Sequence, residues 1–447
     1  MKKFIQTLKN IWSIEELRSK ILFTLLLTAV YRIGSFIPLP GINPIALEQL
    51  SKSQAQNGIL DLINTFAGGA FNMASIFALG IMPYITASIF VQLMTVLVPS
   101  FQKMQKEGES GRKKINQITR YITVVVTMVQ AFAYVAYLRQ TSGAAIIPSY
   151  GATYFTLTTV VILTAGTLFV MWLGEKITDK GLGNGTSLII MIGILARLPQ
   201  SFAQELAIRS ERTGDILIFI IEIALYILIN MGCILLIQAV RKVPVNYAKQ
   251  IVGNRQFGGA RQFLPLKVNA AGVMPIIFAQ AILFVPTLFT MGNPNSSLGR
   301  MFTDHTNIWY MIIYSVVVIG FTFLYTALIF NPKQISDNLK QNNGFIPGVK
   351  PGQPTTDYIG TIMDRITLPG SIMLAFVGIL PGIVQLLFTG MTTSFAMFFG
   401  GTSLLIMVAV ILDTLQQIET HLMMRQYDGL MKSGRIQGRQ TASAVQL

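Results

Sequence analysis

GTSLIIM at residues 185–191 and GTSLLIM at residues 401–407 differ at a single position, although they stand in opposite halves of the chain. A second pair, ALGIMPYI at residues 78–85 and AAGVMPII at residues 270–277, shares the pattern Ala-x-Gly-apolar-Met-Pro-x-Ile. Gly and Pro inside apolar sequence mark places where a membrane helix begins, breaks or is closely approached. The two pairs predict that one unit has been duplicated.

Apolar segments long enough to cross a membrane fill most of the chain. Hydrophobic residues make up 52% and charged residues 12%, whereas a soluble domain carries roughly 25% charged residues. A span needs about 20 apolar residues. We predict ten spans, at residues 21–37, 73–98, 121–138, 155–173, 186–198, 216–240, 268–291, 308–330 and 368–387, with a tenth from about residue 395. Both motif pairs then lie five spans apart.

The basic residues predict the topology. With the N-terminus inside, 27 of the 34 Lys and Arg residues fall on the inside and 6 on the outside, and Arg32 lies in the first span. This is a strong positive-inside bias, and it accounts for most of the +15 net charge without a nucleic-acid partner. It indicates an even number of spans with both termini cytoplasmic. Because five is odd, the two halves are inverted, and inverted repeats place the functional pathway at their interface.

The N-terminal segment does not have the apolar core or cleavage site of a signal peptide. Phe4, Leu8, Ile11 and Trp12 share one helical face, which is typical of an interfacial helix; a frayed basic start is the alternative. We predict a cytoplasmic interfacial helix at 1–20, an N-terminal half at 21–200, a C-terminal half at 201–426 and a cytoplasmic tail at 427–447.

The repeats select Ile85, Ile277, Ile190 and Ile406, which occupy matching positions in the two halves. A ring of apolar side chains can gate a pore by excluding water. Ordinary apolar packing or lipid contact is the alternative. Before span two, residues 59–70 are apolar but too short to cross the bilayer, which fits a half-helix that re-enters a cavity or a surface helix.

Two inside loops are unusually long, and long loops in compact proteins are usually functional or disordered. Residues 241–267 hold six basic residues and no acidic one, and residues 331–367 contain PGVKPG at 347–352. Basic hairpins would suit phosphate-rich RNA or an acidic protein face.

Six motifs along the chain resemble those of the bacterial SecY family, in register from about residue 14 to residue 430. They are YRIGSFIPLPG at 31–41, ALGIMPYI at 78–85, KEGESGR at 106–112, WLGE at 172–175 with GNG at 183–185, LPLKVN at 264–269 and GGTSLLI at 400–406. The resemblance implies an all-α polytopic membrane protein of ten helices, whose two inverted halves form a clamshell around a central pore.

The resemblance also implies a function and its sites. The family conducts unfolded secretory polypeptides across the bacterial inner membrane and releases membrane segments sideways, between spans two and three and spans seven and eight. By position, the pore ring falls on Ile81, Ile85, Thr186, Ile190, Ile277 and Ile406. The plug falls on residues 59–72, including Ile59, Leu62, Phe66, Gly68, Gly69 and Asn72. Implied partners are SecE, SecG, the SecA ATPase, ribosomes, nascent chains with signal sequences, and membrane lipid, with no specific DNA.

Four positions carry further expectations. Arg255, Arg261 and Lys350 are expected to dock the cytosolic partners; Lys350 stands where the family often has Arg, which binds carboxylate and phosphate bidentately as Lys does not. Thr186 is polar where the ring is usually apolar. We expect its hydroxyl to bond a backbone carbonyl of its own helix, which would turn its methyl to the pore.

Polar groups in spans two and three suggest how the lateral exit is held. We expect Thr86 and Gln130 to hydrogen-bond across the gate, a link worth roughly 0.6–2 kcal/mol in a membrane. The alternative, that each bonds its own backbone or faces another helix, stays open.

A secondary transporter with inverted repeats is the alternative function. Coupled transport needs ionisable groups in the membrane, and the clear candidates are Glu222 and Arg32. An enzyme is not expected, because neither paired carboxylates nor His residues stand at usable spacing. With one Cys, two distant His residues and no P-loop, the sequence indicates no cofactor or metal site.

Overall fold

The computed structural model describes most of the chain, and its helices account for all ten predicted spans. The described residues are 14–43, 66–142, 146–147, 151–211, 215–247, 250–252, 255–257, 261–290, 306–388 and 390–432, with the single residues 12, 46 and 64. Most of the predicted interfacial segment 1–20 and of the tail 427–447 lies outside these residues. Residues 15–20 belong to the first span helix.

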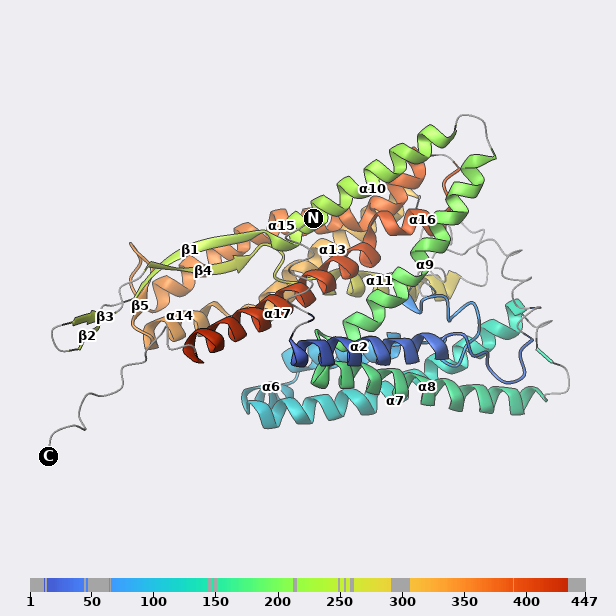
Figure 1. The fold of residues 1–447 in the computed structure, drawn as a ribbon, viewed down its shortest axis with the longest axis horizontal. Coiled ribbons are helices and arrows are strands. Elements are labelled where there is room, and N and C mark those ends of the chain that lie inside the picture. The colour runs from blue at the N-terminus through green and yellow to red at the C-terminus, as the bar shows by residue number, and fades with distance from the viewer. Residues whose placement is uncertain are drawn as a thin grey trace.

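Six helices are described in the first half. They are α2 (Glu15–Gly34), α5 (Met82–Leu97), α6 (Pro99–Lys106), α7 (Glu109–Ser142), α8 (Ala152–Lys180) and α9 (Gly185–Ser210). The second half contains α10 (Asp215–Gln238), α11 (Met274–Thr290), α13 (Ile308–Ile329), α14 (Pro332–Gln341), α15 (Gln353–Leu387), the short α16 (Thr393–Ala396) and α17 (Gly401–Lys432). In Figure 1, α2, α7 and α8 lie together below α10, α13 and α15, and α9 crosses between the two groups.

Seven of these helices are long and apolar enough to span a membrane by themselves, and α5 with α6 forms a further pair bent by 99°. The bend follows Val98, where Pro99 starts the new helix. Proline disfavours helical backbone in the residue before it, and Val98 is extended. The chain therefore turns sharply where span two meets the inner surface.

Both motif pairs open helices. Met82-Pro83 begins α5 and Met274-Pro275 begins α11, because a proline near the start of a helix loses no hydrogen bond there. Gly80 (φ +53°) and Gly272 (φ +65°) precede these starts in the left-handed region, which glycine adopts without steric cost. The predicted start of span two at residue 73 is therefore wrong, since residues 67–81 form turns.

The two GTSL motifs also begin helices. Asn184 caps α9, because its side chain accepts hydrogen bonds from the backbone N–H groups of Thr186 and Ser187. Gly401 opens α17 at φ +65°, so the tenth span starts after the short helices that follow residue 392. The fifth span is longer than predicted, because α9 continues past Pro199 to Ser210.

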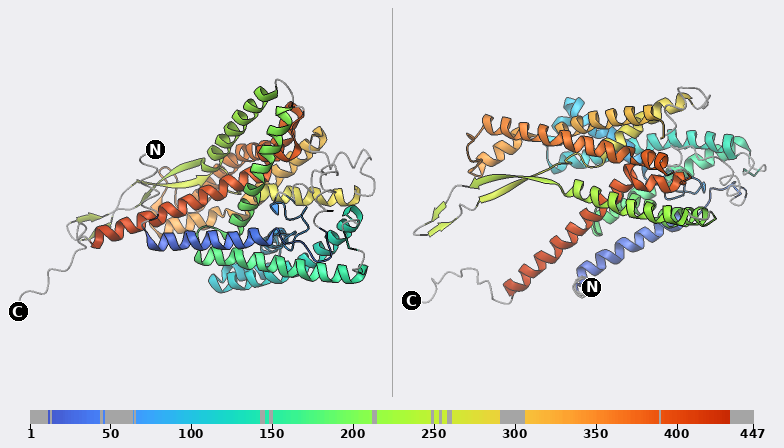
Figure 2. Two further views of the ribbon diagram at one scale, coloured as in Figure 1. Left: turned by 45° about the vertical axis from the view of Figure 1, so that its right-hand side comes forward. Right: turned by 90° about the horizontal axis from the view of Figure 1, so that it is seen from above.

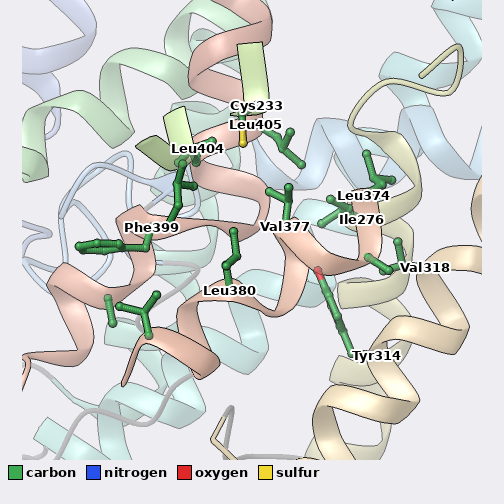
Figure 3. Close-up of a cluster of buried hydrophobic side chains, with 14 of the residues drawn as sticks. Cys233, Ile276, Tyr314, Val318, Leu374, Val377, Leu380, Phe399, Leu404 and Leu405 are labelled. Carbon is green, nitrogen blue, oxygen red and sulfur yellow. The ribbon is translucent and has the colours of Figure 1, made fainter. Parts of the chain in front are cut away.

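Apolar side chains cover much of the outer surface, as expected for helices that face lipid. On α10, Leu217, Leu228 and Leu235 are each more than 60% exposed. Inside the second half, α10, α11, α13, α15 and α17 share one large core. Figure 3 shows this core, with Leu374, Val377 and Leu380 packed between Ile276, Val318 and Leu405.

The long inside loops fold together, so the all-α description needs one correction. Strand β1 (Val240–Tyr247) pairs antiparallel with β4 (Arg261–Lys267), and β5 (Gly344–Phe345) of the other loop adds to the free edge of β1. A separate hairpin joins β2 (Gln250–Val252) to β3 (Arg255–Phe257). Figures 1 and 2 show β1 and β4 alongside α14 and α15, at the end where α2 begins and α17 ends, with the β2-β3 hairpin farther out. We call this the inner end and the opposite one the outer end.

Candidate functional site

Five of the six predicted ring residues lie in a single apolar cluster, although four helices supply them. Ile81 stands at the start of α5, Ile190 on α9 and Ile406 on α17, and each is no more than 7% exposed. Ile85 of α5 and Ile277 of α11 pack against them. We call these five residues the isoleucine ring. Because both halves contribute, the ring is a contact between the two repeats.

The hydroxyl of Thr186, the sixth predicted ring residue, has a different partner from the expected one. Its Oγ1 donates to the side-chain Oδ1 of Asn184 at 2.6 Å, not to a backbone carbonyl. Its methyl faces Gly174 of α8, since a Cβ on Gly174 would meet it at 3.0 Å. The cap residue of α9 thus holds the hydroxyl, and the methyl lies beside α8.

The described part of the predicted plug packs against the cluster that contains the ring. Phe66 is 6% exposed and belongs to the same cluster. Arg32 of α2 donates to the carbonyl oxygen of Gly68 at 3.1 Å. Gly68 is at φ +65° and fits against Gly193 of α9, where a Cβ would lie 2.9 Å from the backbone. Ile59 and Leu62 lie outside the described residues.

Hydrogen bonds fix the rest of this segment. The Asn64 side chain accepts from the backbone N–H of Asn72 at 3.1 Å. The Tyr134 hydroxyl of α7 donates to the carbonyl oxygen of Phe71 at 2.6 Å. Gly69, at φ +91°, leaves open space around its Cα. The C-terminal part of the plug region is therefore tied to the first half alone by these bonds.

The seam between the halves runs where α5 meets α11 and α13. Ile89, Ala271, Phe278 and Tyr325 form a small buried cluster there, and the Phe278 and Phe321 rings stack at 5.4 Å. One polar link crosses it, because the Tyr325 hydroxyl donates to Oε1 of Gln92 at 3.0 Å. Sequence reasoning missed this pair. A Gln inside the apolar helix α5 was the available signal, but its partner is 233 residues away.

The expected link between Thr86 and Gln130 is absent from the described residues. The Thr86 hydroxyl donates to the carbonyl oxygen of Met82 on its own helix at 3.1 Å, as the alternative held. Gln130 on α7 is half-buried. In this structure Gln92 and Tyr325 provide the polar contact across the seam.

The predicted docking residues belong to the β4-β1-β5 sheet of the inner end, to the separate β2-β3 hairpin and to the loop beside them. Arg255 lies in β3 and Arg261 in β4. Lys350 is exposed, and the loop that carries it is held by the Thr355 hydroxyl, which donates to the carbonyl oxygen of Lys350 at 2.8 Å. A core that includes Val243, Leu339 and Ile359 supports the sheet. Both loops thus form one folded unit.

The two intramembrane charges make structural contacts. Arg32 binds the backbone of the plug region, as described above. Glu222 is fully buried and accepts from Nη2 of Arg209 at 2.7 Å. Arg209 was predicted as an outside-loop charge, but it lies within α9 and is 2% exposed. Among the described residues, no three His, Cys, Asp or Glu side chains are grouped so that they could hold a metal ion.

Comparison with known proteins identifies the family. The family model of SecY matches residues 75–415. The chain belongs to the SecY family. The protein translocase subunit SecY of Mycobacterium tuberculosis is 41% identical, with 96% of this chain and 99% of that protein covered. The SecY subunit of Thermus thermophilus is 42% identical, with 97% and 99% covered.

Solved structures agree with the SecY fold. One described as "The structure of a protein conducting channel" superposes with a TM-score of 0.64 at 16% identity, covering 90% of this chain and 92% of that one. Sec61 in a canine ribosome–channel complex gives 0.59 at 15% identity, with the same coverage. The fold therefore persists where little sequence identity remains, and a transporter is not favoured.

Proposed function

We propose that this chain is the pore-forming subunit of a protein translocase, through which unfolded secretory polypeptides cross the bacterial inner membrane. One observation carries the proposal beyond family membership: the isoleucine ring joins residues from both inverted repeats into one apolar cluster at their interface. Inverted repeats place a transport pathway at that interface. The chain is a channel and not an enzyme, so the energy comes from a partner.

The ring suits a pore that must accept any polypeptide. Isoleucine offers neither donor nor acceptor to water or ions, and a narrow apolar constriction closes by drying. Its side chain is also stiff at χ1, so the ring keeps its shape. A passing chain meets only dispersion contacts, which do not select a sequence. Phe66 and the rest of the plug add a second barrier on the outer side.

The seam provides the sideways exit. Its contacts are a small apolar cluster and the Gln92–Tyr325 hydrogen bond. A hydrogen bond between membrane helices is worth roughly 0.6–2 kcal/mol, so an apolar signal sequence or membrane segment can replace these contacts with its own. We infer that such segments part α5 from α11 and α13 and move into lipid.

We assign each expected partner to a surface of the molecule. SecA and ribosomes would dock on the inner-end sheet and the Lys350 loop, whose basic residues complement acidic or phosphate-rich faces. SecE and SecG would cover lipid-facing apolar helices. Both termini would be cytoplasmic, which the positive-inside bias and the position of α2 and α17 at the inner end support.

A crosslinking experiment tests the function. A photoreactive residue at Ile190 should crosslink to an arrested nascent secretory chain, because that chain must pass the ring. The same residue at lipid-facing Leu228 on α10 serves as the control and should crosslink to lipid. Failure of the Ile190 probe to reach the nascent chain, while export proceeds, would reject the pore assignment.

Charge reversal tests the docking surface. Arg255→Glu with Lys350→Glu should weaken binding of SecA and of ribosomes, most strongly at low salt, because exposed charges are screened at higher ionic strength. Binding is measured on vesicles at two salt concentrations. Lys113→Glu on α7 is the control. Unchanged affinity at low salt for the double variant would contradict the proposal.

A further inference from the structure

Helix α9 is the last helix of the first half, yet its two parts pack on different halves. Before Pro199, Gly185 fits closely against Gly174 of α8, and Gly193 fits against Phe66 and Gly68 of the plug region. Ile189 and Ile194 are fully buried in the cluster that includes Leu27 of α2 and Val170 of α8. The inner part of α9 therefore packs on the first half, and it also meets the second half through the apolar cluster of the ring, which includes Ile406 and Val410 of α17.

After Pro199, one face of α9 turns to the second half. Phe202 packs its ring against Phe219 of α10 at 5.1 Å and against Phe395 of α16 at 6.2 Å. Glu205 and Arg209 follow at the spacing that places side chains on the same helical face. Phe202, Glu205 and Arg209 all make contacts with elements of the second half. The contacts of Glu205 and Arg209 are described next.

The charged contacts are buried and directional. One Glu205 oxygen accepts from both the backbone N–H and the hydroxyl of Thr392, at 2.8 and 2.7 Å. Arg209 donates to the other Glu205 oxygen at 3.1 Å and to Glu222 of α10 at 2.7 Å, and it lies 3.5 Å from Asp215. Glu205, Arg209 and Glu222 are each no more than 2% exposed. We call Glu205, Arg209, Glu222 and Thr392 the outer clamp.

Pro199 lies between these two parts, inside an otherwise continuous helix. Proline has no N–H to donate to the carbonyl four residues earlier, and its ring clashes with that carbonyl. A helix bends most readily at such a point. The position also coincides with the boundary between the halves that the end of the fifth apolar segment indicated.

We propose that the two halves pivot at Pro199 within α9, and that the outer part of α9 moves with the second half because the outer clamp holds it there. The connection between α9 and α10 then lies inside one rigid body. Opening of the seam and ring bends α9 at Pro199, while the clamp stays intact. Arg209, Glu205 and Pro199 are positioning residues for the channel.

A proline substitution tests the pivot. Pro199→Ala supplies the missing N–H. The hydrogen bond that this restores should shift the equilibrium between the straight and the bent helix about two- to tenfold toward the straight form. Export of a secretory protein should slow by a similar factor in cells that depend on this chain, while resistance of the purified channel to heat stays equal or rises. Pro369→Ala is the matched control, because Pro369 is also an exposed proline inside a helix, but within α15 alone.

A crosslinking experiment distinguishes a pivot at Pro199 from a pivot in the connection between α9 and α10. In a Cys233→Ala background, cysteines at Phe202 and Phe395 are joined by a short thiol crosslinker. The channel should still export at about half the wild-type rate or more, because both sites belong to one rigid body. Cysteines at Gln92 and Tyr325, crosslinked across the seam in the same way, should block the sideways release of membrane segments.

The outcomes decide between the two pivots. The proposal is overturned if the 202–395 crosslink stops export as fully as a crosslinked seam stops release, because α9 would then move as a whole against the second half. Equal export by Pro199→Ala and wild type, or equal slowing by Pro199→Ala and Pro369→Ala, would also overturn it.

Discussion

Two of the contacts between the halves of this channel are chemically opposite. At the isoleucine ring and the seam they share apolar side chains and one neutral hydrogen bond. At the outer end of α9 they share buried carboxylates, a buried guanidinium and a threonine. The first contact is made from groups that separate at little cost, while the second leaves uncompensated charges if it is broken.

The difference indicates which contact the channel opens. Apolar surfaces can exchange one apolar partner for another, such as a signal sequence or lipid, without losing a specific bond. The outer clamp has no such substitute, because a lipid tail cannot satisfy Glu205 or Arg209. We therefore expect one reversible and one permanent contact between the same two halves, on different faces.

Removal of the clamp cation should give the largest effect. Arg209→Met leaves Glu205 and Glu222 buried without their counter-charge, and breaking a buried pair costs about 3–5 kcal/mol. The free energy of unfolding in detergent measures it. Lys113→Met is the control and should leave stability unchanged, because the Lys113–Glu109 pair is exposed at 76% and 85%.

A second substitution sharpens that result. Adding Glu222→Met to Arg209→Met removes one of the two orphaned charges, so part of the lost stability should return. If Arg209→Met is as stable as the wild type, the outer contact is no stronger than the apolar one and the comparison fails.

Polar substitution of the ring should break the apolar seal without unfolding the channel. Ile190→Asn together with Ile406→Asn places two amides where water was excluded, so the resting channel should pass ions. Each single variant should leak less, and planar-bilayer conductance measures both. Thr186→Ile should change conductance little, because the side chain at this position packs beside Gly174 of α8. A double variant as tight as wild type would mean that the plug alone carries the barrier.

The smallest effect is expected at the seam. Tyr325→Phe removes only the hydroxyl that binds Gln92, at a cost of about 0.6 kcal/mol, or roughly a threefold change in an equilibrium constant. Marginal signal sequences should be accepted correspondingly more often, measured as the fraction of a weak-signal reporter that is exported. Gln92→Leu should act in the same direction, and Tyr121→Phe on the exposed face of α7 should not. Identical client selectivity in Tyr325→Phe and wild type would show that this hydrogen bond does not hold the seam.

Sequence patterns were informative wherever a property repeats along the chain. Apolar run length gave the ten spans, and the paired motifs gave four of the ring isoleucines. They failed where the backbone is locally unusual. Residues 73–81 are apolar enough for a helix, but the turns around Gly80 delay α5 until Met82.

Partners of polar side chains were beyond the reach of the sequence. Thr186 and Thr86 both bond within their own segments, whereas Gln92 binds a residue 233 positions away and Glu205 one 187 positions away. Arg209 looks like an outside charge in the sequence, because the apolar run ends before it. It becomes buried because α10 and Thr392 supply its environment.

The sequence by itself determined the number of spans and their inverted arrangement, and it predicts the inside surface and an apolar pore ring. These follow from the composition of each segment and from the spacing of the repeated motifs and basic residues along the chain. Only the tertiary structure decided that Gln92 meets Tyr325, that the outer part of α9 belongs to the second half and that two loops build one sheet. The physical reason is that a buried polar group takes whichever partner the packed helices bring within hydrogen-bonding distance, and that choice is made between segments far apart in the chain.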